Sequence, residues 1–219
     1  MSWDWQVFFQ DTGSGQTYLN WMMSAWGWTL LVSAFSLVVA LTVGSLMGIL
    51  RTTPVKAFVW IGNAWTELFR NIPLLVQIFL WYHVIPSLFK PLQAVPDFIA
   101  VVIALGFFTS ARISEQVRAG IQALPQTYRY VLLPMAFRII VPPLTSESMN
   151  IIKNSSVAFA VSITELTFFA MQAQEETSRG VEIYLAVTFL YFISAFAVNR
   201  VAHYVEERVK VPGMIGGGR

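Results

Sequence analysis

The sequence predicts an all-α integral membrane protein with about five transmembrane helices. Its residues are 56% hydrophobic and only 12% charged, which is about half the charged fraction of an ordinary soluble domain. The apolar residues also form long blocks. Met22–Leu50 carries no charge, and at a rise of ~1.5 Å per residue it is longer than the ~30 Å of a bilayer's hydrocarbon core.

Five apolar blocks account for the predicted spans, with ends uncertain by a few residues. In chain order they are Met22–Leu50, Pro73–Leu88, Phe98–Ala111, Ser155–Met171 and Val181–Val198. The segment Phe58–Arg70, just before the second span, mixes tryptophan with charged residues and is typical of a helix at the membrane surface.

The distribution of basic residues predicts the orientation. One set of loops and the C-terminal tail hold most of them: Arg51, Lys56, Arg118, Arg129, Arg138, Arg200, Arg208, Lys210 and Arg219. The opposite loops hold only Lys90 and Arg179, beside several glutamates. The positive-inside rule therefore places the N-terminus outside and the C-terminus in the cytoplasm.

This orientation divides a single transmembrane domain, residues 1–219, into three parts. Residues 1–21 form an outer, periplasmic segment with no basic n-region, so we expect no cleaved signal peptide. Residues 22–206 form the helical bundle, with a cytoplasmic loop near 119–143. Residues 207–219 form a cytoplasmic tail.

Charged residues continue the third span beyond its apolar part. Arg112, Glu115 and Arg118 follow at intervals of three, which places them along one stripe of a continuing helix. The stripe either anchors the helix at the inner membrane surface or faces a partner helix or a transport path. Spacing alone leaves both interpretations open.

The fourth span is the weakest by hydropathy, because its uncharged stretch between Lys153 and Glu165 is too short to cross a bilayer alone. Asn154, Ser155 and Ser156 lead into it. Ionisable groups at membrane depth are costly unless they face protein or water. We therefore expect this helix at the centre of the bundle, with Lys153, Asn154 and Glu165 turned inward and lining a path.

Small residues recur along the first span at Ala40, Gly44 and Gly48. This four-residue spacing favours close helix packing, although chance in a span rich in glycine and alanine would produce it too. The ridge predicts association between helices and says nothing about function.

Several chemistries find no support in the sequence. The phosphate-binding pattern Gly-x-x-x-x-Gly-Lys-Ser/Thr is absent, so we do not expect this chain to hydrolyse nucleotide. His83 and His203 fall on opposite sides of the membrane, and the chain has no cysteine, so no metal site or catalytic group is predicted. A net charge of +2 gives no reason to expect nucleic acid. We therefore predict a protein that is not an enzyme and needs no cofactor.

Four motifs, in order, resemble the permeases of ATP-binding-cassette (ABC) importers for polar amino acids. They are Phe69-Arg-Asn-Ile-Pro-Leu-Leu-Val-Gln77, Ala111-Arg-Ile-Ser-Glu-Gln-Val-Arg-Ala-Gly-Ile-Gln122, Val131-Leu-Leu-Pro-Met-Ala-Phe-Arg138 and the stretch from Asn150 through Lys153-Asn-Ser-Ser156 to Glu165-Leu166. The tryptophan-rich acidic N-terminus and the C-terminal Val-Glu-Glu-Arg-Val-Lys-Val-Pro-Gly are similar to the glutamate/aspartate branch. The resemblance implies a MetI-like bundle in the bacterial inner membrane.

The same resemblance implies partners and site residues. The family works with ATPase subunits inside, a second permease subunit, which is either a copy or a similar chain, and a periplasmic substrate-binding protein. The residues expected to contact the ATPase are Arg129, Tyr130, Val131, Leu133 and Pro134. The residues expected along the substrate path are Arg112, Asn154, Ser155, Ser156 and Glu165.

The chain departs from the family pattern in the cytoplasmic coupling loop. The family carries Glu-Ala-Ala, a glycine and Ile-x-Leu-Pro there, whereas Ile121-Gln-Ala-Leu-Pro125 here continues directly into Gln126-Thr-Tyr-Arg-Tyr-Val131. Most of the helix that docks on the ATPase is thus missing, which predicts at most one or two helical turns over Gln126–Pro134 and weaker coupling.

Two other classes of function stay open at this point. The chain could be a non-transporting scaffold subunit or an inactive truncated allele, in which case restoring the loop would distinguish a broken transporter. It could also be a channel or secondary carrier, whose uptake would persist without ATP.

Overall fold

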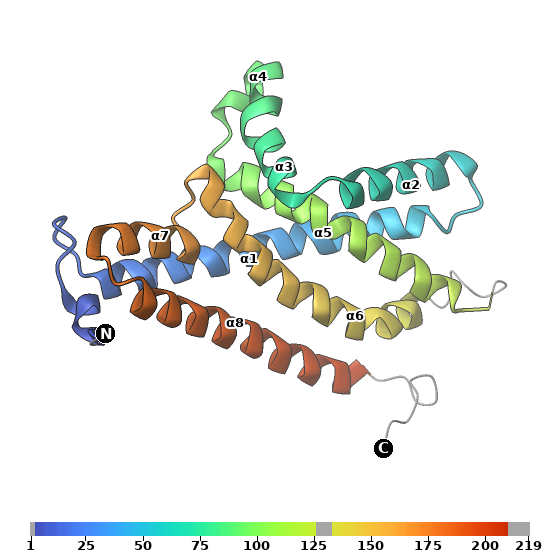
Figure 1. Cartoon of the computed structure of the whole chain (residues 1–219). Helices are drawn as coiled ribbons and strands as arrows, with labels where there is room; N and C mark the ends of the chain where they lie inside the picture. Colours follow the sequence, from blue (N-terminus) through green and yellow to red (C-terminus); the bar gives the residue numbers. More distant parts are fainter. Residues whose placement is uncertain (1–2, 126–132, 210–219) are drawn as a thin grey trace.

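The computed structural model describes residues 3–125 and 133–209. Three long helices form its frame: α1 (Tyr18–Leu50), α5 (Asp97–Gln122) and α8 (Gly180–Val209). Each is long and apolar enough to cross a membrane. Thr17 caps α1, because its side chain accepts a hydrogen bond from the backbone N–H of Asn20. α5 packs along α1 (Figure 1).

Two further segments, each a bent pair of helices, are together long and apolar enough to cross a membrane. α2 (Lys56–Asn71) is followed by α3 (Leu74–Phe79), the π-helical turn η2 (Leu80–Val84) and α4 (Ile85–Leu88). The chain turns by 106° between α2 and this second segment. Pro73 lies at the turn, where its ring disfavours a helical residue before it. The short 3₁₀ helix η3 (Lys90–Ala94) then leads to α5.

The second bent pair is α6 (Leu133–Asn154), continued by the 3₁₀ helix η5 (Ser155–Val161), and then α7 (Leu166–Thr177). The bend between η5 and α7 is 53°. Ser162 makes the break with a left-handed φ of 61°, a conformation that L-residues seldom adopt. If each bent pair is one span, the described residues contain five, as predicted.

The fourth span differs from the expectation in where it begins. The helical segment does not start at Ser155 but at Leu133, within the range expected to be a cytoplasmic loop, and it passes through Pro142 and Pro143 without ending. The polar residues of this helix made it hard to recognise in the sequence. Thr145 and Glu147 are buried where α6 packs against α5 and α8, whereas Ser146 and Lys153 are exposed.

The small-residue ridge of α1 lies against α5. An added Cβ at Gly44 would come within 2.7 Å of the Cβ of Ile113, and one at Gly48 within 2.6 Å of the Cβ of Val117. Real Cβ atoms do not approach so closely, so only glycine permits this separation of the two helices. The close packing suggested by the spacing is confirmed.

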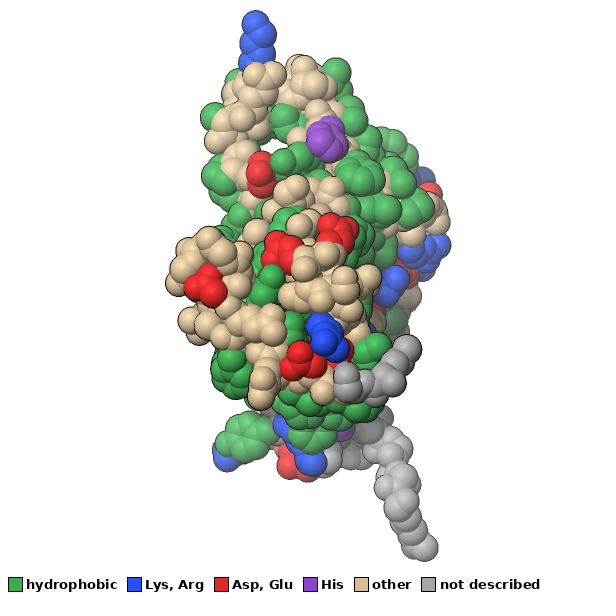
Figure 2. All heavy atoms as spheres, turned by 60° about the vertical axis from the view of Figure 1, so that its left-hand side comes forward, with side chains coloured by type: hydrophobic (Ala, Val, Ile, Leu, Met, Phe, Trp, Pro, Cys, Tyr) green, Lys and Arg blue, Asp and Glu red, His purple; other side chains and the backbone are tan. Residues whose placement is uncertain are grey.

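The N-terminal segment closes the end of the bundle that we call the outer end. Its short 3₁₀ helix η1 (Trp5–Phe9) buries Val7 and Phe8 in a cluster with α7 and α8. The backbone N–H of Asp4 donates to Glu182 (2.9 Å), and the Tyr18 hydroxyl donates to Glu176 (2.7 Å). Acidic side chains gather over this end in Figure 2, and its outside position stays a prediction.

Candidate substrate path and coupling end

A polar cluster joins α5 to α6 deep in the bundle. Arg112 and Gln116 on α5 approach Glu147 on α6: Nη1 of Arg112 lies 3.9 Å from one carboxylate oxygen, and Nε2 of Gln116 donates to the other over 3.4 Å. Arg112 also lies over the ring of Phe108, 5.0 Å from its centroid. Three polar groups thus converge between two packed helices.

The polar groups of this cluster are incompletely paired. Among the described residues, Oε2 of Glu147 and Oε1 of Gln116 are buried and accept no hydrogen bond. Buried polar atoms are nearly always paired, but here Oε1 of Gln116 has no donor among the described residues and Oε2 of Glu147 has only the long ion pair with Arg112. The side chain of Glu147 is only 10% exposed, whereas that of Arg112 is 44% exposed. The cluster therefore opens toward one surface of the bundle.

Arg112 lies well inside α5, away from its end. It precedes the end of α5 at Gln122 by about 15 Å, and Glu147 follows the start of α6 by about 20 Å, at 1.5 Å per residue. A guanidinium at such depth avoids acyl chains. We therefore predict that the surface that exposes Arg112 faces protein or water in the assembled molecule.

The other predicted path residues lie farther along the fourth span. Ser155 is buried and Asn154 and Ser156 are half-buried, where α6 becomes η5. The hydroxyls of Ser155 and Ser156 donate to the backbone carbonyls of Ile152 and Lys153, each over 2.7 Å. The structure does not bring these three residues next to Arg112, and their role in a path stays a prediction.

Glu165 is fully buried and caps α7. Its carboxylate accepts hydrogen bonds from the backbone N–H of Thr167 (2.8 Å) and Phe168 (2.9 Å) and from the hydroxyl of Tyr191 (2.6 Å). These contacts give Glu165 a structural role in starting the helix. It faces the bundle interior as expected, but its oxygens are already occupied.

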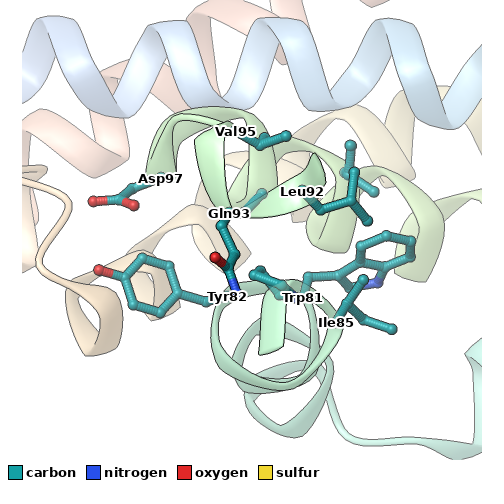
Figure 3. A pocket seen from close by; sticks show the side chains of 10 residues that line it. Trp81, Tyr82, Ile85, Leu92, Gln93, Val95 and Asp97 are labelled. Atoms are coloured by element: carbon teal, nitrogen blue, oxygen red, sulfur yellow. The ribbon is translucent and has the colours of Figure 1, made fainter. Parts of the chain in front are cut away.

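Lys153, which we also expected inside, is exposed. Together with Tyr191 and Asn199 it lines an open groove of about 450 Å³ between α6 and α8. A second, smaller cavity of about 110 Å³ lies between η2, η3 and the start of α5. In Figure 3 the Tyr82 hydroxyl points toward Asp97 across this cavity. Its lining includes a carboxylate and no cation, which does not suit an acidic solute.

Of the segment expected to contact the ATPase, the structure describes only the two flanking ends. α5 ends at Gln122, and Leu133 and Pro134 begin α6. Arg129, Tyr130 and Val131 lie outside the described residues, as does most of Gln126–Pro134, so the expected loop helix stays a prediction.

Sequence reasoning missed Glu147 and Gln116. The signal was present: Gln116 follows Arg112 by four residues, on the same helix face. Glu147 was assigned to no span, because the helix that carries it was placed too late in the chain.

None of the protein-family models matches the chain. The chain is 38% identical to the glutamate/aspartate import permease protein GltJ of Escherichia coli K12, over 99% of each sequence. It is 30% identical to the probable glutamine ABC transporter permease protein GlnM of Bacillus subtilis, over 83% of this chain and 90% of GlnM. The chain belongs to the amino-acid ABC transporter permeases.

The fold agrees with this family. A crystal structure of an amino acid ABC transporter with histidines superimposes with a TM-score of 0.79, covering 95% of this chain and all of that one at 24% identity. The MetI-like permease bundle is therefore confirmed, as is a multi-pass protein of the bacterial inner membrane. The alignment with GltJ spans 244 positions, whereas this amino-acid permease has 219 residues, so GltJ carries residues that have no counterpart here.

Proposed function

We propose that the chain is the transmembrane subunit of a binding-protein-dependent ABC importer for glutamate and aspartate. The observation that carries the proposal is the identity with GltJ, which extends over almost the whole of both sequences. A match of that extent covers every span and every loop outside the shortened segment.

The proposed assembly contains two such permease subunits, two ATPase subunits inside and a binding protein outside. ATP hydrolysis belongs to the ATPase subunits, because this chain carries no phosphate-binding loop. The exposed guanidinium of Arg112 supports a second permease subunit, since a partner or a shared aqueous path must cover it. Closure of the ATPases would rock the two bundles around that path.

The α5–α6 cluster offers complementary charges to an amino acid. In this proposal Arg112 attracts a substrate carboxylate, while the Glu147 oxygen that faces Arg112 accepts from the substrate ammonium group. The loose 3.9 Å pair between the two side chains would then open to admit the zwitterion. An acidic amino acid brings one more carboxylate, for which Lys153 is the nearest cation along α6.

The coupling residues are Arg129, Tyr130, Val131, Leu133 and Pro134 in this proposal. The motif pattern between α5 and α6 supports a shortened segment there, and GltJ carries residues that have no counterpart in this chain. A shorter segment fills less of an ATPase groove, so the second candidate is a permease that assembles but couples poorly or not at all. The residues that GltJ carries and this chain lacks favour this poorly coupled permease as the second candidate.

Two substitutions test the substrate role in proteoliposomes containing the ATPase and the binding protein. Arg112→Gln and Glu147→Gln should each reduce glutamate uptake by about 10-fold or more, because each removes a charge-assisted contact worth roughly 1.5–3 kcal/mol. Arg200→Gln removes an arginine that only stacks on Phe196 and should leave uptake unchanged. Wild-type uptake by both cluster variants would contradict the assignment.

A further inference from the structure

Arg51 connects three helices near the inner end of the bundle. It ends α1, and its side chain is only 5% exposed. Its Nε donates to Asn63 on α2 (2.8 Å), Nη1 donates to Thr66 on α2 and Ser114 on α5 (3.3 Å each), and Nη2 donates to Glu115 on α5 (2.9 Å). We call Arg51, Asn63, Thr66, Ser114 and Glu115 the Arg51 junction.

The junction is closed on the α2–α5 side as well. The hydroxyls of Thr66 and Ser114 lie 2.9 Å apart, and both residues are buried. An added Cβ at Gly62 would lie 2.5 Å from Cγ of Arg51, so the glycine makes room for the guanidinium stem. Little space is left for α1, α2 and α5 to slide past one another.

A planar guanidinium is needed to make these contacts. Four of the five N–H donors of an arginine are directed at four acceptors on two helices. A lysine ammonium would keep the attraction to Glu115 but could not direct hydrogen bonds to both helices, because it lacks the rigid, forked arrangement of N–H donors of a guanidinium. Two more cations, Arg70 (3.4 Å) and Arg118 (4.0 Å), lie near Glu115 but are partly exposed, and they do not link the helices in the same way.

The junction lies near the end of α5 that leads into the coupling segment. Glu115 is about 10 Å from the end of α5 at Gln122, at 1.5 Å per residue. On its other side α2 leads into the 106° turn and α3. In Figure 1 the end of α1, the start of α2 and the later half of α5 lie at the same end of the molecule. A displacement of the end of α5 would thus reach α2 through Arg51.

We propose that Arg51 is a positioning residue that joins the end of α1, α2 and the inner half of α5 into one rigid body, so that movement at the coupling segment is passed to α2–α4. The transport consequence rests on the proposed function. The rigid body itself does not, because it is a property of the single chain.

The rigid body is tested in the full-length chain, in nanodiscs of bacterial phospholipid. The protein has no cysteine, so spin labels can be placed at the exposed Ala57 on α2 and Ala119 on α5. Electron–electron double resonance should give a narrow distance distribution for the wild type and a broad one for Arg51→Gln. Thr66→Val, which keeps the packing and removes one acceptor, should broaden it partially. Arg70→Gln, which removes only the exposed partner of Glu115, should not broaden it.

The consequence for transport is tested by counting substrate molecules moved per ATP hydrolysed in proteoliposomes. Arg51→Gln should lower this ratio by at least about 5-fold while ATP hydrolysis continues, because sites that communicate are coupled by about 1–3 kcal/mol. A merely structural role would reduce the amount of complex without changing the ratio. Adding Thr66→Cys and Ser114→Cys should restore the ratio under oxidation, since their hydroxyls are already in contact, and reductant should abolish the rescue.

The outcomes distinguish a failure of the proposed transport function from a failure of the rigid body held by the Arg51 junction. Absence of ATP-driven uptake both in the wild-type chain and in the chain with the restored coupling helix contradicts the proposed function, and the spin-label measurement still tests the rigid body. A narrow distribution in both Arg51→Gln and Thr66→Val overturns the rigid body. An unchanged transport ratio in Arg51→Gln, in a transporting wild type, overturns its role in coupling.

Discussion

At the scale of single residues, two buried glutamates of the fourth span have opposite surroundings. Glu165 has its carboxylate occupied by two backbone N–H groups and a tyrosine hydroxyl. Glu147 has one oxygen that accepts a long hydrogen bond from Gln116 and one whose contact is the 3.9 Å ion pair with Arg112. Satisfied polar groups stabilise a fold, whereas unsatisfied ones indicate a ligand or a partner. This contrast makes Glu147 the better candidate for function and Glu165 the better one for stability.

The residue-scale prediction concerns Glu165→Ala. The substitution removes the cap of α7 and leaves the Tyr191 hydroxyl without its acceptor, so it should destabilise the protein by about 1–3 kcal/mol. Thermal unfolding of the purified protein in detergent measures the change. Glu67→Ala, at an exposed site on α2, is the matched control. Equal melting temperatures for the two variants would show that the cap contributes little.

At the scale of helices, the contact between α1 and α5 holds the bundle together. Lipid gives no hydrophobic drive to associate two apolar helices, so close van der Waals packing of small residues must supply the stability. Gly44 and Gly48 bring α1 against Ile113 and Val117 of α5. The Arg51 junction then fixes the same pair of helices at their inner end.

Gly48→Ala tests this packing. The new methyl would lie 2.6 Å from the Cβ of Val117, so the helices must separate, at a cost of about 1–3 kcal/mol. Gly27→Ala on the same helix meets nothing within 4 Å and should leave stability unchanged or raise it by up to about 1 kcal/mol, because alanine favours helix over glycine. Thermal unfolding of both variants checks the prediction, and a loss of stability at Gly27 as large as at Gly48 would contradict it.

The sequence was informative where a helix must face lipid and uninformative where protein covers it. The long apolar runs of α1, α5 and α8 predicted three spans directly. In lipid, a spanning segment must satisfy its backbone hydrogen bonds within itself, which a helix does. α6 was placed too late because it carries polar residues, of which Thr145 and Glu147 are buried in the bundle against its neighbours. The contacts of Arg51 and of Arg112 with other helices join residues far apart in the chain, and no local pattern specifies such pairs.

At the scale of the whole molecule, charge is divided between the two ends. Asp4, Glu176 and Glu182 lie at the outer end with η1 and α7, and Arg51 and Arg118 lie near the opposite end of α5. By the positive-inside rule, this asymmetry predicts that the end with Arg51 and Arg118 lies in the cytoplasm and the end with η1 lies outside.

Cysteines introduced at Ser14 and Gly217 test that orientation. In a chain without native thiols, a membrane-impermeant maleimide should label the first from outside and the second only after the membrane is opened. The cysteine-free parent is the control for background labelling. Labelling of both positions from the same side would contradict a five-span topology.

The central claim, an ATP-driven importer of acidic amino acids, is tested most directly by uptake in proteoliposomes containing this chain, its ATPase and its binding protein. The account predicts glutamate or aspartate uptake that requires both ATP and the binding protein, and a higher rate when the missing coupling helix is restored. Uptake that persists without ATP would indicate a carrier or channel and contradict the account. So would the absence of uptake both with and without the restored helix.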